Sequence, residues 1–99
     1  MCEFKIIKQN DNNQIAEDIL VLSYNDNNEL LIKDILGMGI KIDSALILDV
    51  NTLTQKCMIL EHPLVNDFIR LIKDLTSNSA NTAIIQKMIN NLEDLKSSL

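Results

Sequence analysis

The hydrophobic positions of the first sixty residues follow the short-period pattern typical of β-strands. In residues 1–8 apolar and charged side chains alternate, and the later apolar runs are separated by the turn sequences NDNN, GMG and NTLT. The expected later strands span about 15–24, 29–33, 41–43, 46–50 and 55–61. Strict alternation in 15–24 would place Ile19 on one side and Leu20 and Leu22 on the other. The pattern predicts a small antiparallel β-meander or barrel of five to six strands.

Two of these runs do not alternate. Residues 46–48 read LIL and residues 57–60 read CMIL, so both runs are apolar on both faces of the strand. A sheet with one face in water should instead alternate apolar and polar residues. We therefore expect another part of the chain, or a second subunit, to cover the outer face of the sheet.

The last third of the chain has the period of amphipathic helices. Pro63 suits the first helical position, where its missing N–H has no cost, with His62 before it as a polar hinge or N-cap. A second helix is expected from about residue 82, capped by Ser79 or Asn81. The apolar positions recur every three or four residues, at Val65, Phe68, Ile72 and Leu75 in the first helix and Ile84, Ile85, Met88, Ile89, Leu92, Leu95 and Leu99 in the second.

The short connector between these helices predicts an antiparallel helical hairpin that packs on the sheet or on a second subunit. The fold class is then α+β, with a β-meander or barrel followed by a C-terminal α-helical hairpin. Ninety-nine residues suffice for a single domain, made of a β subdomain over 1–61 and the hairpin over 63–99.

Composition narrows the possible partners. The chain carries a formal net charge of −5 and has only Tyr24, Phe4 and Phe68 as aromatic residues. Both features disfavour nucleic-acid binding, since phosphate contacts need positive charge and base stacking needs aromatic surface. No segment is long and apolar enough to span a bilayer, and no signal-peptide pattern precedes the first strand. We expect a cytoplasmic protein.

The sequence offers few residues suited to catalysis, and we expect that the protein is not an enzyme. His62 is the single imidazole, whereas a nucleophilic serine or cysteine would need such a base within hydrogen-bond reach. The GMG sequence is too short for a phosphate-binding loop, so Gly37 and Gly39 are interpreted as turn residues with positive φ.

The two NDNN sequences are candidate metal-binding turns. Residues 10–13 and 25–29 are rich in carboxylate and amide oxygens, which calcium prefers as ligands. The EF-hand spacing is absent, however, and plain hairpin turns are the favoured interpretation. Whether these turns bind calcium stays open at this point.

The two cysteines differ in their surroundings. Cys57 lies in an apolar run, which predicts a buried, inert thiol. Cys2 follows the initiator methionine. If Met1 is removed, the free amine, the thiolate and the first backbone amide gather nitrogen and sulfur donors on one residue, a set that suits square-planar nickel or copper.

Several short motifs occur in a recognisable order. They are Met1-Cys2, a first strand ending at Lys8, Glu17-Asp18-Ile19, Asp34-Ile35-Leu36-Gly37, Asp49-Val50 and Ile59-Leu60-Glu61. Over residues 1–61 this order resembles the small CooT-like family of nickel-binding accessory proteins for carbon monoxide dehydrogenase maturation. Relatives of that family are often labelled as predicted RNA-binding proteins.

The resemblance implies a compact β-barrel-like domain that forms a homodimer, with the second-position cysteine of each subunit as nickel ligand. Only Cys2 matches a functional position of the family. Glu3 and Phe4 stand where small apolar residues are usual, and the helical tail has no counterpart. The leading hypothesis is therefore a small non-enzymatic nickel accessory protein with Cys2 as metal ligand. The alternative is a protein–protein interaction module that binds a partner, or a second copy, through its helical hairpin.

Overall fold

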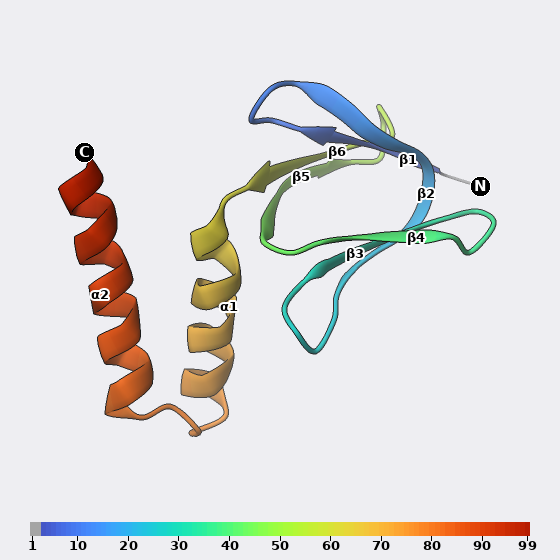
Figure 1. Cartoon of the computed structure of the whole chain (residues 1–99). Coiled ribbons are helices and arrows are strands. Elements are labelled where there is room, and N and C mark those ends of the chain that lie inside the picture. Colours follow the sequence, from blue (N-terminus) through green and yellow to red (C-terminus); the bar gives the residue numbers. More distant parts are fainter. Residues whose placement is uncertain (1–2) are drawn as a thin grey trace.

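The computed structural model describes residues 3–99, and within them the chain forms six strands followed by two helices (Figure 1). This arrangement confirms the predicted α+β class. The elements are β1 (Phe4–Lys8), β2 (Asn13–Tyr24), β3 (Leu30–Asp34), β4 (Gly39–Ile42), β5 (Ala45–Asn51), β6 (Lys56–Glu61), α1 (Pro63–Thr76) and α2 (Thr82–Ser98).

The strands form one mixed sheet in the order β4-β3-β2-β1-β6-β5. A wholly antiparallel meander was expected, but β1 and β6 pair in parallel, with Ile6 opposite Cys57. The parallel pair arises because β5 and β6 form a separate hairpin that joins the sheet at the free edge of β1. Within residues 3–99, β4 and β5 are the two outer strands and do not pair with each other, so the sheet is not closed into a barrel.

Tyr24, at the end of β2, reaches across to the edge strand β5. Its hydroxyl donates to the Ala45 carbonyl at 2.7 Å and accepts from the Ile47 N–H at 3.3 Å. These are backbone groups of edge strand β5 that would otherwise lack a strand partner. Burial raises the pKa of this phenol above its usual value. The phenol thus makes hydrogen bonds to the outer edge of β5 that a neighbouring strand would otherwise make.

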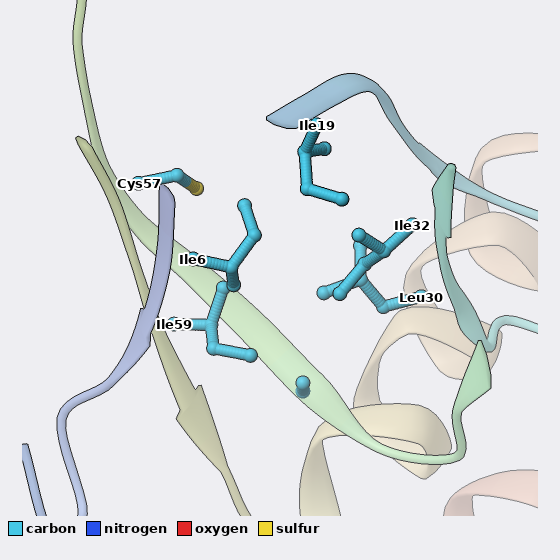
Figure 2. Packing of buried hydrophobic residues seen from close by; sticks show 7 residues of the cluster. Ile6, Ile19, Leu30, Ile32, Cys57 and Ile59 are labelled. Atoms are coloured by element: carbon cyan, nitrogen blue, oxygen red, sulfur yellow. The ribbon is translucent and has the colours of Figure 1, made fainter. Parts of the chain in front are cut away.

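The hydrophobic core is built from strand residues. Side chains of β1 and β6 point toward those of β2 and β3 across the curved sheet (Figure 2). Among the described residues, the buried core consists of Ile6, Ile19, Leu30, Ile32, Ala45, Cys57 and Ile59. The core is therefore assembled without any helical residue.

β-Bulges change which side chains reach this core. Between Ile19 and Val21, two steps along β2 correspond to one step along β3. The bulge places both Ile19 and Leu22 on the core side, so the predicted separation of these two residues is wrong. A further bulge lies in β5 between Ile47 and Asp49. Within the LIL run, Ile47 packs against the core, whereas Leu46 and Leu48 are exposed on the other side.

The glycines of the β3–β4 turn have different roles. Gly37 has the predicted positive φ of 82°. Gly39 does not have a positive φ; an added Cβ there would lie 3.2 Å from the Ile32 carbonyl oxygen, so a side chain would crowd the neighbouring strand β3. The predicted turn conformation with positive φ is therefore confirmed for Gly37 and wrong for Gly39, which begins β4.

Candidate interaction surface on the helical hairpin

The helical hairpin begins with a cap that the sequence predicts. Pro63 is the first residue of α1, and the Nδ1 atom of His62 accepts from the Leu64 N–H at 3.0 Å. In α2, the Asn81 side chain accepts from the Ile84 N–H at 3.1 Å. His62 therefore serves as the N-cap of α1, one of the two structural roles expected for it.

Asn66 and Ser44 join α1 to the sheet. The Asn66 amide group donates to the carbonyls of Asn27, Asn28 and Asp43 at 2.8–3.2 Å. The Ser44 hydroxyl accepts from the Asn66 N–H at 2.8 Å and donates to the His62 carbonyl. These bonds tie the first turn of α1 to two loops of the sheet. Sequence reasoning missed this joint, because neither residue belongs to a local motif.

A polar hollow of about 650 Å³ lies beside this joint. The Asn10 side chain bonds both the N–H and the carbonyl of Glu61 at 2.9 Å, and the Lys8 ammonium lies 3.7 Å from the Glu61 carboxylate. The residues lining the hollow are Lys8, Asn10, Asp43, Ser44, Glu61, His62, Pro63, Asn66 and Asp67. Since most of these groups are engaged in holding strands and helix together, we interpret the hollow as part of the joint.

α1 lies between α2 and the sheet and packs beside β5 (Figure 1). The outer face of the sheet is not fully covered within the chain, since Leu46 and Leu48 of β5 are 44% and 43% exposed. In both helices, which lie entirely within the described residues, no side chain is buried. The hairpin therefore stands largely outside the hydrophobic core.

The seam between the helices has a polar side. A groove of about 230 Å³ follows this side, and the Asn91 amide donates across it to the Asp67 carboxylate at 3.2 Å. Its lining includes Asp67, Arg70, Asp74, Lys87 and Asn91, together with Leu71, Ile84 and Met88 from the seam itself. Charged and amide groups thus gather on one side of the hairpin.

The other side of the seam is apolar. At 100° per residue, Phe68, Ile72 and Leu75 lie on the side of α1 opposite Arg70 and Asp74. The same geometry in an antiparallel partner places Ile85, Ile89 and Leu92 of α2 on that side too. We call these six residues the hairpin face. Their exposed fractions are between 41% and 53%.

The sequence predicted that the apolar positions of both helices would pack on the sheet or on a second subunit, and within the chain only some of them are covered. Ile84 and Met88 line the seam and are half-buried, together with Leu71, which was not among the predicted positions, whereas the hairpin face is left half in solvent. The signal that could have revealed the division is the width of the apolar arc on each helix, which exceeds what one neighbouring helix can bury. Monomeric proteins seldom expose so many large apolar side chains together.

A second exposed apolar group lies in the β3–β4 turn, at Ile35, Leu36 and Met38. The turn is closed by Asp34, whose carboxylate accepts from the N–H groups of Leu36 and Met38 at 2.9 and 3.0 Å. These side chains project from one short loop, whereas the hairpin face spans two helices. The hairpin face is therefore the broader of the two candidate interaction surfaces.

The metal-binding candidates have different outcomes. Cys2 lies outside the described residues. Cys57 is buried as predicted, and burial, followed by the nearby charge of Asp49, raises the pKa of its thiol. From residue 3 onward, no group of three or more His, Cys, Asp and Glu side chains is placed to hold a metal ion.

Side-chain oxygens of Asp11 and Asn25 accept hydrogen bonds within the NDNN turns, whereas the buried Oδ1 of Asn28 has no hydrogen-bond partner. One Asp11 oxygen accepts from the Asn13 N–H at 3.0 Å, and the Asn25 side-chain oxygen accepts from the N–H groups of Asn27 and Glu29 at 3.0 Å. The hydrogen bond from Asn25 is also the main cause that lowers the pKa of Glu29. These contacts are those of hairpin turns, the interpretation favoured by the sequence.

No protein-family model and no curated protein matches this chain. Neither helix is long and apolar enough to cross a lipid bilayer.

Proposed function

We propose that this chain is a non-enzymatic protein–protein interaction module whose binding surface is the hairpin face. The observation that carries the proposal is the half-exposure of Phe68, Ile72, Leu75, Ile85, Ile89 and Leu92 along one side of two packed helices.

The construction of the hairpin supports this role. The core is complete without helical residues, so the hairpin face is not needed to form it. Asn66 meanwhile anchors α1 to two loops, which holds the face in a defined orientation. A rigid apolar helix face that excludes water on binding is a recurrent mode of protein recognition.

A site-specific photo-crosslinker tests the proposal. With the crosslinking residue at position 72, irradiation of the full chain should attach it to a partner, because Ile72 lies in the middle of the face. The matched control carries the same group at position 73, whose side chain points away from the face. The experiment is run with purified protein and again in cell extract. Equal yields at the two positions under both conditions would contradict the proposal.

The nickel hypothesis rests on the Met1-Cys2 sequence and the motif order alone, and it stays a prediction about residues 1–61. Its test concerns Cys2 and is independent of the hairpin face.

A further inference from the structure

We propose that the partner of the hairpin face is a second copy of the same chain, so that two hairpins form a four-helix assembly about a two-fold axis. This inference rests on the proposed interaction function and names its occupant. Three features of the hairpin lead to it: its area, its charge and its symmetry.

The area is close to that of a specific dimer. A large apolar side chain offers on the order of 150 Å² of surface, so six at about half exposure supply roughly 450 Å² per copy. Two copies then bury ~900 Å² from the face alone, close to the ~1,000 Å² that a specific protein–protein interface must reach. Fringe residues of both helices add to this area.

The charge distribution suits two like-charged copies. Residues 63–99 contain four basic and four acidic side chains, so the whole excess of negative charge lies in residues 1–62. The six face positions are uncharged, and the charged groups of the seam line the opposite groove. Two chains of net charge −5 can therefore meet through their one electrically neutral part. A basic partner would be attracted to the acidic sheet instead.

The symmetry of the face also suits a copy of itself. Three apolar side chains come from each of two helices, so a two-fold axis that lies in the interface, over the seam, sets the apolar rows of one copy against those of the other. Such a surface forms an isologous interface, in which each face residue contributes twice. Packing two helical hairpins face to face yields the layered core of a four-helix bundle.

Sedimentation equilibrium of the full chain tests the proposal at concentrations from roughly 1 to 200 µM. We expect a mass rising with concentration to twice the 11.2 kDa of the chain. Ile72→Glu and Ile89→Glu should each raise the dissociation constant at least ~100-fold, since symmetry places each carboxylate twice in an apolar interface. The double variant Ile72→Ala, Ile89→Ala preserves helix propensity and should weaken the dimer by at least ~10-fold.

The matched control is Leu53→Glu, an identical gain of charge at a side chain that is 94% exposed in the β5–β6 turn. It should leave the dissociation constant within about twofold of the wild-type value. A wild-type chain that stays monomeric throughout, or a dimer that survives all the face variants, would overturn the proposal.

Failure of this inference can be told apart from failure of the interaction function. If the purified chain is monomeric but the crosslinker at position 72 captures another protein in extract, the second copy is ruled out and the interaction function stands. If position 72 gives no more crosslinking than position 73 in either setting, both proposals fail.

Discussion

At the scale of single residues, Asn66 holds the helical hairpin to the sheet. Its side-chain amide contacts three carbonyls from two loops, Asn27, Asn28 and Asp43. Asn66→Ala would leave these acceptors without their donor, and each lost bond of this kind costs roughly 0.5–1.5 kcal/mol. We expect urea denaturation to show a loss of about 2 kcal/mol in the free energy of unfolding.

The control for this substitution is Asn90→Ala, at an exposed position of α2 whose side chain accepts from Gln86. It should change the stability by no more than about 0.5 kcal/mol. Equal effects at the two positions would contradict the anchoring role of Asn66.

Cys57 makes stability sensitive to alkaline pH. Because burial raises the pKa of its thiol in the folded chain, folding favours the protonated form. This contribution to stability is present below the ordinary thiol pKa and is lost as the pH rises above it. Above about pH 8.5 the free energy of unfolding should fall, by at most ~1.4 kcal/mol per pH unit from one thiol.

Cys57→Ala should flatten this alkaline slope, and chemical denaturation at a series of pH values measures it. The phenol of Tyr24, whose pKa burial also raises, adds a further decline at higher pH in both proteins. An unchanged slope in Cys57→Ala would contradict the assignment to the thiol.

Cys2 carries the prediction that comes from the family resemblance. Titration of nickel into the wild-type chain should produce thiolate charge-transfer absorbance, because an N-terminal amine and thiolate form a suitable donor set once Met1 is removed. Cys2→Ala should abolish the band, whereas the buried thiol of Cys57 should not contribute to it. Intact mass reports whether Met1 is present. Identical titrations of the two proteins would end the nickel hypothesis.

At the scale of secondary-structure elements, the sheet does not depend on the hairpin for its hydrophobic core. The core is formed by strand residues, and no residue of α1 or α2, both described throughout, is buried. A chain ending at His62 should therefore keep a cooperatively folded sheet, with a stability reduced by about 2 kcal/mol through loss of the Asn66 and Ser44 contacts.

Circular dichroism melting and dispersed amide resonances would report the folded sheet in this truncated chain. Its solubility should exceed that of the full chain at high concentration, since the hairpin face is gone. A truncated chain that is unfolded would show that the hairpin is part of the core structure and would weaken the proposed docking role.

At the scale of the whole molecule, the separation of charge from apolar surface governs association. Each copy carries its net negative charge on residues 1–62 and its apolar face on the neutral hairpin. Raising the salt concentration from about 50 to 500 mM screens the repulsion between copies and strengthens apolar contact. The dimer dissociation constant should therefore fall several-fold, as measured by sedimentation equilibrium. A weakening with salt would indicate an interface held by ion pairs instead.

The sequence alone determined the elements whose signals are local. The turn sequences, the Pro63 start of α1 and the Asn81 cap of α2 depend on residues that are neighbours in the chain, and the α+β class follows from them. The apolar residues of the helices were also identified, and they include all six residues of the hairpin face.

Only the tertiary structure decided how these parts meet. The parallel pairing of β1 with β6, the bulge after Ile19 and the anchor at Asn66 depend on contacts between distant segments. The same holds for the division of the helical apolar residues into a filled seam and an exposed face. A hydrophobic pattern indicates which side chains should be shielded from water. The packing of the folded chain determines whether that shielding comes from the same molecule or from a partner.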